Sequence, residues 1–336
     1  MRLMKPIVVT SGVDSEYVLG ELAEYLRNRD FQVHELDFGV TQGDVRPLLE
    51  QLRGERVVYV TSAHSNLTGR MAETHTPGLL KKYPNYLAPL EIFAHLNPIK
   101  SFYIPHDLLS PFGESNLDEY RYLDLFDHVM SPVAEPNLLP LIGKHTQVHH
   151  AGWMKYQDVD ESQTACHLPQ VAGSPRITFF ISFVEHFQAK HGAVGIAEYF
   201  KEILVEGVRV KLPVWQGVEK IEEAIREHTD ATVISARCLS TSLIAQSDVV
   251  ICNGASSVAA ESIMRGVPVI CLVDDEAELA HEKRQKLKSL PQVVFHDFHE
   301  RSRISGDVWS AALSQQLTSQ MKAFDFELMT QLLSEI

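Results

Sequence analysis

The 336-residue chain contains few cysteines and no long apolar run, and both absences narrow what the protein can be. Its four cysteines include no CxxC pair, and Cys252 and Cys271 lie in apolar runs typical of buried strands. Such residues indicate core thiols in a reducing compartment. No stretch approaches the roughly 18 apolar residues of a membrane-spanning helix. The apolar run in the opening "MRLMKPIVV" is too short for a signal peptide, so we expect a cytoplasmic protein.

Positive charge is also scarce, because 30 Lys and Arg face 44 Asp and Glu and leave a net charge of −14. A nucleic-acid partner needs a basic face, so the composition argues against one while leaving room for a local basic pocket. The acidic excess fits a surface kept soluble by its charge. The apolar fraction of 45% is ordinary for a globular protein, and the length favours two domains.

The sequence lacks several motifs that would indicate a class of enzyme or a metal site. The chain has no GxGxxG dinucleotide fingerprint, no GxxxxGK(S/T) phosphate loop and no GxSxG nucleophile elbow. His149 and His150 are adjacent and would point to opposite faces of a strand. The stretch 296–300 has no cysteine or second carboxylate cluster nearby, 274–276 suits a helix start, and no DxD motif stands in a suitable context. The sequence therefore predicts no metal site.

What the chain does have is a regular alternation of short β-branched runs with amphipathic stretches, which predicts parallel strands connected by helices. The predicted strands are 6–11, 31–38, 56–63, 101–105, 126–132 and 147–152, then 176–183, 208–214, 231–236, 247–252, 267–273 and 292–297. The predicted helices of the second half are 193–204, 217–228, near 239–246, 256–266 and 276–290. The Pro- and Gly-containing stretch 166–175 reads as a linker. The predicted fold class is α/β, with two Rossmann-like domains, 1–168 and 176–336, that face a central cleft. A further expectation is that the C-terminal helices pack back on the first domain.

In parallel sheets ligands bind beyond the carboxyl ends of the strands, and the main candidate is "SDVVICNGASSVAAESIMRGVP" (247–268). It reads as strand, tight turn and helix, with Gly254 permitting the turn. Ser256 or Ser257 suits the N-cap, and the helix N-terminus offers N–H groups to a phosphate. A carboxylate at Glu261 can accept hydrogen bonds from ribose or sugar hydroxyls. The alternative is that the serines merely cap the helix and Glu261 faces solvent.

This block, closed by Arg265-Gly266, resembles the nucleotide-binding block of GT-B glycosyltransferases, and the strand order is similar to that fold over essentially the whole chain. The paired serines resemble those of the CDP-glycerol glycerophosphotransferase and bacterial polysialyltransferase groups, in which such serines hold donor phosphate. The block is also similar to that of UDP-N-acetylglucosamine 2-epimerases. In the first half, "FYIPHDLLSPF" resembles the acceptor-side motif of the glycerophosphotransferases. Two departures, His106-Asp107 for His-Gly and Asn253-Gly254 for Asp-Tyr, leave the donor open.

The resemblance implies an acceptor on the first domain and a donor nucleotide on the second. Transfer to a hydroxyl needs a base, and groups that stabilise the departing phosphate. His106 follows a predicted strand and suits proton transfer near neutral pH, while Asp107 is either the base itself or the group that orients the imidazole. His64 is the rival base. Arg70 could meet an anionic acceptor, and the turn at Gly12 could admit an acceptor or simply connect two elements.

On the donor side, Lys190 or His186 would neutralise the leaving phosphate, and Arg237 either lines the nucleobase or is a surface cation. The predicted donor-binding residues are Ser182, His186, Lys190, Arg237, Asn253, Gly254, Ser256, Ser257 and Glu261.

The sequence thus predicts an inverting, metal-independent glycosyltransferase, or polyol-phosphate transferase, that needs no cofactor beyond its nucleotide-activated donor. The expected partners are a nucleotide sugar and a carbohydrate or lipid-linked acceptor in bacterial surface polysaccharide synthesis, with peripheral association at the inner membrane as an option. Two alternatives are a UDP-sugar 2-epimerase or nucleotide-sugar hydrolase, and a non-catalytic nucleotide-sugar-binding protein. The sugar, nucleobase, acceptor and oligomeric state stay open.

Overall fold

The computed structural model describes residues 5–12, 19–37, 45–62, 89–105, 121–132, 144–154, 156, 174–182, 184–213, 218–235, 238–253, 257–273, 293–297, 303–315 and 322–335. The chain divides into two compact units. Unit 1 comprises Met1–Tyr156 and Lys322–Ile336, and unit 2 comprises Gln157–Met321. Unit 2 is therefore inserted between the two parts of unit 1.

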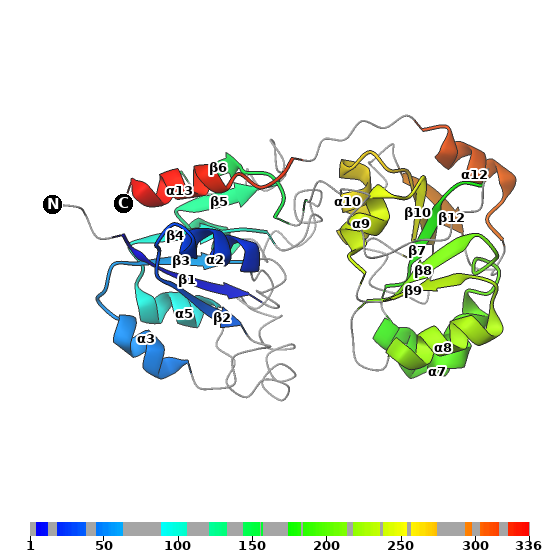
Figure 1. Cartoon of the computed structure of the whole chain (residues 1–336), viewed down its shortest axis with the longest axis horizontal. Coiled ribbons are helices and arrows are strands. Elements are labelled where there is room, and N and C mark those ends of the chain that lie inside the picture. Colours follow the sequence, from blue (N-terminus) through cyan, green and yellow to red (C-terminus); the bar gives the residue numbers. More distant parts are fainter. Residues whose placement is uncertain are drawn as a thin grey trace. The chain divides into compact units, whose positions relative to one another are not determined.

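Unit 1 is built on a six-stranded sheet in the order β2-β1-β3-β4-β5-β6 (Figure 1). Every neighbouring pair is parallel, so the carboxyl ends of all six strands lie at one edge. The elements are β1 (Ile7–Gly12), α2 (Gly20–Arg27), β2 (Val33–Asp37), α3 (Arg46–Leu52), β3 (Val57–Thr61), α5 (Pro89–Leu96), β4 (Lys100–Tyr103), η2 (Arg121–Leu125), β5 (His128–Ser131), β6 (Gln147–His150) and α13 (Phe326–Ser334).

Helices cover both faces of this sheet (Figure 1). Val8 and Phe102 belong to the face that packs against α2 and α13. Val9 and Tyr59 belong to the opposite face, which packs against α3 and α5. Where both faces of a strand are buried, the strand is a nearly continuous apolar run, as in β3, and such strands are easy to recognise in the sequence. The edge strands β2 and β6 are more polar.

The C-terminal segment enters unit 1 beside the end of β6. The Trp153 N–H donates to the Lys322 carbonyl at 3.0 Å, and the Asp325 N–H donates to the Ala151 carbonyl at 2.7 Å. Between these contacts Gly152 has a φ of +84°, and a Cβ atom at this position would lie 2.2 Å from a backbone carbonyl oxygen of the returning segment. The approach is therefore possible because residue 152 is a glycine.

Helix α13 is then held on α2 by an exposed cluster around Glu327. The Glu327 carboxylate accepts hydrogen bonds from the Tyr25 hydroxyl and the Arg29 guanidinium, each at 2.6 Å. The Tyr25 ring stacks on Phe326 at 4.7 Å between centroids, and the Arg29 guanidinium lies 3.7 Å from the centre of the Tyr25 ring. These polar and ring contacts hold α13 on α2, in addition to the apolar side chains of α13 that pack on the sheet.

Two histidines lie on neighbouring strands of the sheet face that α13 covers. The His128 ring stacks on Phe102 at 4.6 Å, and its Nδ1 lies 3.0 Å from Nε2 of His149. Burial lowers the pKa of His128 to about 4, helped by the nearby charges of His149 and Lys100 and opposed by carboxylates including Asp127 and one at the end of α13. Burial also lowers the pKa of His149. The pair is therefore neutral at pH 7 and shares one N–H···N hydrogen bond.

Unit 2 repeats the design with a second six-stranded parallel sheet, in the order β12-β11-β10-β7-β8-β9 (Figure 1). Its elements are β7 (Ile177–Phe180), α7 (Val184–Tyr199), β8 (Val208–Lys211), α8 (Val218–His228), β9 (Thr232–Ile234), α9 (Ser240–Ala245), β10 (Val249–Asn253), α10 (Ser257–Met264), β11 (Val269–Val273), β12 (Val293–Asp297) and α12 (Gly306–Leu313).

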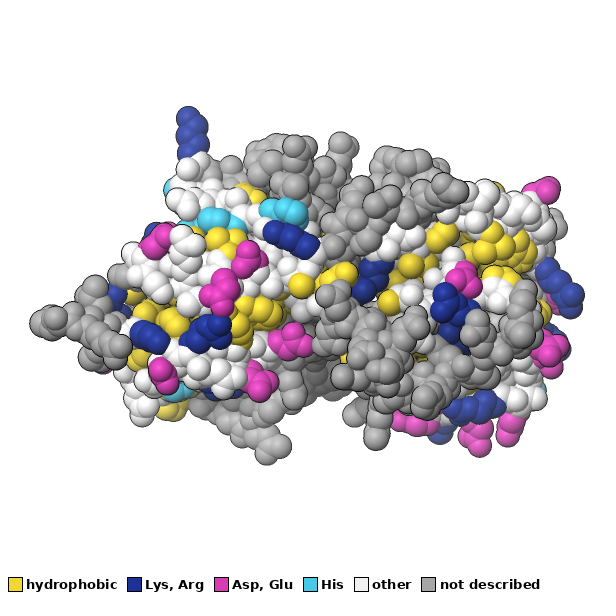
Figure 2. All heavy atoms as spheres, turned by 45° about the horizontal axis from the view of Figure 1, so that its top comes forward, with side chains coloured by type: hydrophobic (Ala, Val, Ile, Leu, Met, Phe, Trp, Pro, Cys, Tyr) yellow, Lys and Arg dark blue, Asp and Glu magenta, His cyan; other side chains and the backbone are white. Residues whose placement is uncertain are grey.

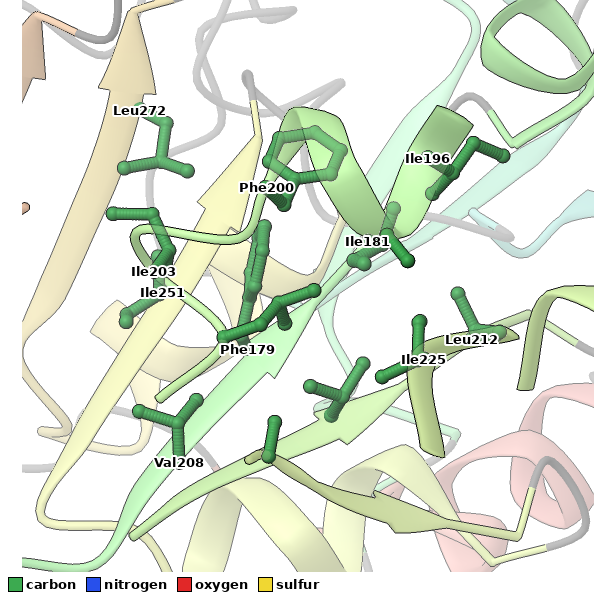
Figure 3. Close-up of a cluster of buried hydrophobic side chains, with 14 of the residues drawn as sticks. Phe179, Ile181, Ile196, Phe200, Ile203, Val208, Leu212, Ile225, Ile251 and Leu272 are labelled. Atoms are coloured by element: carbon green, nitrogen blue, oxygen red, sulfur yellow. The ribbon is translucent and has the colours of Figure 1, made fainter. Parts of the chain in front are cut away.

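The main core of unit 2 lies between the sheet and helices α7 and α8. Figure 3 shows Phe179 of β7 and Ile251 of β10 among aliphatic side chains, with Phe200 above them. The Phe179 and Phe200 rings meet edge to face at 5.3 Å. On the opposite face of the sheet, a smaller cluster including Phe180 and Leu243 packs under α9. Helices thus pack on both faces of the sheet, and this packing fixes the positions of its strands.

The structure confirms every predicted strand, with ends that shift by a few residues. The predicted helices 217–228 and 256–266 correspond to α8 and α10. Helix α7 consists of two helical segments that meet at Gly192, whose φ of +69° is not helical. The predicted helix 193–204 therefore matches the start of the second segment and extends past its end at Tyr199. The predicted helix 276–290 and most of the linker 166–175 lie outside the described residues.

The surface in Figure 2 shows Lys and Arg side chains interspersed with Asp and Glu over both units. The coloured side chains of this face therefore form no field of one charge sign. Of the helices that the structure describes, none combines the length and apolar character needed to cross a bilayer.

Replacing Gly152 with alanine should destabilise the junction with the C-terminal segment. A left-handed backbone costs a non-glycine residue about 1–2 kcal/mol, and the added methyl group would overlap the Ala323 carbonyl. We expect the free energy of unfolding in urea to fall by more than about 2 kcal/mol, with faster hydrogen exchange over 322–335. Gly54→Ala is the matched control, since Gly54 has a φ of +87° and open space around an added Cβ. Equal losses in the two variants would contradict this packing.

The stability of unit 1 should fall as the pH drops from about 6.5 to about 4. His128 has a pKa of about 4 in the folded state and about 6.5 in the unfolded state, so the unfolded state takes up the proton first. The stabilisation is complete above pH 6.5 and is lost as the pH falls through 4. The loss corresponds to about 3 kcal/mol.

His128→Phe keeps a ring against Phe102 but does not titrate, so its free energy of unfolding should lose about 3 kcal/mol less over the same pH range. Urea denaturation at several pH values measures this difference. His228→Gln, at an exposed position near the end of α8, should keep the wild-type slope. A wild-type slope in His128→Phe would show that another group is responsible.

Candidate functional site

The carboxyl ends of β7 and β10 form a polar corner in unit 2, immediately before residues 254–256, which lie outside the described residues. Asn253 is the last residue of β10 and is 1% exposed. Its Oδ1 accepts a hydrogen bond from the Ser182 backbone N–H at 2.6 Å, and its Nδ2 donates to the Ser182 carbonyl at 2.9 Å. Because β7 and β10 are neighbouring parallel strands, this pair ties the chain leaving β7 to the end of β10.

Helix α10 follows the turn and carries a buried ion pair. It begins at Ser257, and Glu261 lies one turn further along. Glu261 Oε1 accepts a hydrogen bond from Arg265 Nε at 3.1 Å, and the two side chains are only 8% and 6% exposed. Glu261 is therefore not a solvent-facing residue, as the alternative interpretation of the sequence would have it.

Gly266 ends this helix, as the sequence predicts. It has a φ of +78°. Its N–H donates to the Ile263 carbonyl at 3.0 Å, and the Val267 N–H donates to the Ser262 carbonyl at 2.8 Å. These two hydrogen bonds define a Schellman motif, in which a left-handed residue satisfies the last carbonyls of a helix. The backbone at Arg265 is thereby fixed.

A buried cation lies at the carboxyl end of β8, next to β7. Lys211 is the last residue of β8 and is 5% exposed, and its Nζ donates to the Leu212 carbonyl at 3.2 Å. Burial lowers the pKa of its ammonium group to about 8, and the charge of Glu222 opposes the shift. An amine of this kind changes its charge in response to a nearby anion near neutral pH.

The other predicted donor residues are placed only in part. His186 and Lys190 both lie in α7, and Lys190 is exposed. Arg237, Gly254 and Ser256 lie outside the described residues. The structure thus brings Ser182 and Asn253 into direct contact and places Ser257 and Glu261 on the helix that follows.

The carboxyl edge of unit 1 is rich in buried hydroxyl groups. The Ser11 hydroxyl lies 2.5 Å from the Tyr59 hydroxyl, and the Thr61 hydroxyl donates to the Ser11 carbonyl at 2.9 Å. Among the side chains that the structure describes, the Thr10 and Ser62 hydroxyls are fully buried and have no hydrogen-bond partner. An unsatisfied buried hydroxyl costs about 1–3 kcal/mol, so this edge is better suited to binding a polar group than to stability alone.

Gly12 is the last residue of β1 and belongs to this edge. His64, Arg70, His106 and Asp107 lie outside the described residues. The strands that lead toward His64 and His106 are β3 and β4, which are parallel neighbours and so direct the following chain to the same edge.

Sequence reasoning missed two residues, Arg265 as the partner of Glu261 and Lys211 as a buried cation. A signal for the first was present, because residues four apart on a helix are neighbours. For Lys211 the alternation in "VRVK" places Arg209 and Lys211 together on one face of β8. Their burial depends on α9, which no local pattern reveals.

The described part of the chain contains no group of three His, Cys, Asp or Glu residues arranged to hold a metal ion. His128 and His149 lie close together but form only a pair, and their rings hydrogen-bond to one another.

Comparison with known proteins shows the fold. The wall teichoic acid polymerase TagF aligns with 98% of this chain and 89% of its own, with a TM-score of 0.53 and 12% identity. The UDP-GlcNAc 2-epimerase from Neisseria meningitidis, solved with UDP-GlcNAc bound, aligns with 98% of this chain and 100% of its own, with a TM-score of 0.50 and 12% identity. No family model and no curated protein sequence matches the chain. Its two parallel-sheet units thus have the GT-B fold, as the sequence predicts.

Asn253→Asp should loosen the corner between β7 and β10 in a pH-dependent way. An ionised carboxylate can accept from the Ser182 N–H, but it faces the Ser182 carbonyl without a donor. We expect the free energy of unfolding to fall by about 2–4 kcal/mol at pH 7. At pH 4.5 the loss should shrink, because a protonated carboxyl can donate to the carbonyl. Urea denaturation at both pH values, with Asn28→Asp at the exposed end of α2 as control, measures this effect. An unchanged stability at pH 7 would mean that the amide is dispensable.

Proposed function

We propose that the protein is a GT-B glycosyltransferase or polyol-phosphate transferase, which moves a group from a nucleotide-activated donor to a hydroxyl acceptor without a metal ion. The observation that supports this most directly is the carboxyl edge of unit 2. There Asn253 holds the end of β10, α10 begins four residues later, and a buried carboxylate, Glu261, lies one turn into that helix.

Each part of this edge suits one part of a donor nucleotide. The N–H groups at the start of α10, with the hydroxyls of Ser256 and Ser257, suit the donor phosphate. Glu261 suits the ribose hydroxyls, because a carboxylate accepts hydrogen bonds and would repel a phosphate. Lys190 or His186 would balance the charge of the departing phosphate, and Arg237 would line the nucleobase.

The acceptor would bind to unit 1, where the buried hydroxyls of Thr10 and Ser62 mark a polar edge next to Gly12. His106 would take the proton from the acceptor hydroxyl, with Asp107 orienting the ring or acting as the base in its place, and His64 as the rival. The acceptor oxygen then bonds to the transferred group while the nucleotide leaves with the bonding electrons. A single displacement of this kind inverts the configuration at the anomeric carbon of a sugar donor, or at the phosphorus atom of a polyol-phosphate donor.

A thermal-shift panel with CMP, CDP, UDP, GDP and their sugar conjugates tests the donor site. The matching nucleotide, at 100 times its Kd, should stabilise the protein by about 2.7 kcal/mol and raise its melting temperature. Replacing Ser256 and Ser257 together by alanine should abolish the shift. His106→Ala should keep the shift and lose the transfer to an acceptor.

The opposite pattern, with His106→Ala losing nucleotide affinity and the double serine variant keeping it, would reverse the assignment of donor and acceptor. Incubation with the donor alone, followed by mass spectrometry of the sugar, separates a transferase from an epimerase or a hydrolase. A protein that binds no nucleotide in the panel would refute the proposed function.

A further inference from the structure

We propose that Arg265 is a positioning residue of the donor site, which holds the Glu261 carboxylate in the orientation that binds ribose and so makes the protein select ribonucleotides over deoxyribonucleotides. This inference rests on the function proposed above, in which Glu261 accepts hydrogen bonds from the donor ribose. It adds a residue for which sequence reasoning found no role beyond the end of a helix.

The contact between the Arg265 and Glu261 side chains is a buried hydrogen-bonded ion pair. Arg265 Nε donates to Glu261 Oε1 at 3.1 Å, and neither side chain is more than 8% exposed. At such burial the ion pair is screened little by water or salt. The order of the pair, with Glu four residues before Arg, is also the favourable one on a helix. Glu261 therefore has a strong local reason to keep one orientation.

The position of Arg265 is itself fixed by the backbone. It is the last residue before the left-handed Gly266, and hydrogen bonds to the Ile263 and Ser262 carbonyls close the helix around it. Its own N–H donates to the Glu261 carbonyl at 2.9 Å. The guanidinium thus starts from a rigid point one turn away from the carboxylate that it holds.

Positions 257, 261 and 265 are four residues apart and so lie in one row along α10. The row begins at the helix N-terminus, where we place the donor phosphate, and ends at Arg265. Glu261 stands between the two, about one turn from the N-terminus. A ribose that follows a phosphate bound at the N-terminus would therefore meet Glu261, whose carboxylate Arg265 holds in one orientation.

Acceptor capacity also fits this role. A carboxylate offers two oxygens and about four lone-pair sites, and the Arg265 hydrogen bond uses one of them at Oε1. Two ribose hydroxyls could then donate to the same carboxylate. Without the guanidinium, a buried ionised Glu261 would be costly and would take up a proton or turn away, and its acceptor geometry would be lost.

Isothermal titration of the full-length protein with UDP and CDP, and with their 2′-deoxy counterparts, tests the proposal. The wild type should bind the matching ribonucleotide at least about tenfold more tightly than its deoxy form. Arg265→Met should weaken ribonucleotide binding about tenfold and leave deoxynucleotide binding within about twofold. A merely structural role would weaken both, so the deoxynucleotide is an internal control.

Four further variants sharpen the result. Glu261→Gln should lose the same preference, and combining it with Arg265→Met should cause little additional loss, because the two residues act as one unit. Arg265→Lys should restore part of the preference. Arg226→Met, which breaks an exposed Arg–Glu pair of the same spacing and the same 3.1 Å length on α8, should keep the wild-type preference.

The possible outcomes separate the two proposals. A wild type that binds no nucleotide refutes the proposed function itself. Equal binding of ribo- and deoxynucleotides by the wild type refutes the ribose assignment alone. Equal weakening of both nucleotides in Arg265→Met, in Arg265→Lys and in Glu261→Gln would reduce the ion pair to a structural one and overturn the positioning role.

Discussion

Two hydrogen bonds that join one side-chain amide, that of Asn253, to the backbone of Ser182 fix the place in unit 2 on which the proposed donor site depends. At the carboxyl edge of a parallel sheet the backbone groups just beyond the last ladder pair lose their partners. An asparagine amide both donates and accepts, so it can satisfy one N–H and one carbonyl at once. The strand end that leads toward α10 is therefore held at a fixed point.

Because unit 2 is inserted into unit 1, the two parts of unit 1 that contact one another are far apart in the sequence. Tyr25 and Glu327 are 302 residues apart in the chain and yet form a direct hydrogen bond. The entropy of closing a loop grows only with the logarithm of its length, and unit 2 folds as a compact body within it. The contacts around Gly152 and α13 then complete a core that the first part of unit 1 leaves open, since α13 supplies Met329 to that core.

The central strands, such as β3 and β10, were predictable because both faces of each sheet are covered, which makes these strands short apolar runs that local sequence reveals. The end of α10 was predictable as well, because Gly266 is the residue that a left-handed C-cap requires. Other features depend on contacts between distant residues. The start of α7 lies before a glycine kink that interrupts its periodicity, and the contact of Trp153 with Lys322 joins two ends of the chain. The burial of Glu261 was not predictable from composition, since a glutamate on a helix is usually exposed.

The burial of Glu261 and Arg265 bears on why the chain has an ion pair at this place. A buried ion pair loses the hydration of both charges, and replacing it with apolar side chains of similar volume is often neutral or even stabilising. Stability alone is therefore a weak explanation for a Glu–Arg pair at more than nine-tenths burial. A site that must present a carboxylate in one fixed orientation needs such a partner, because an unpaired buried carboxylate would become protonated. The free-energy cost of burying the pair is thus better explained by the proposed binding role of its carboxylate than by what the pair adds to the core.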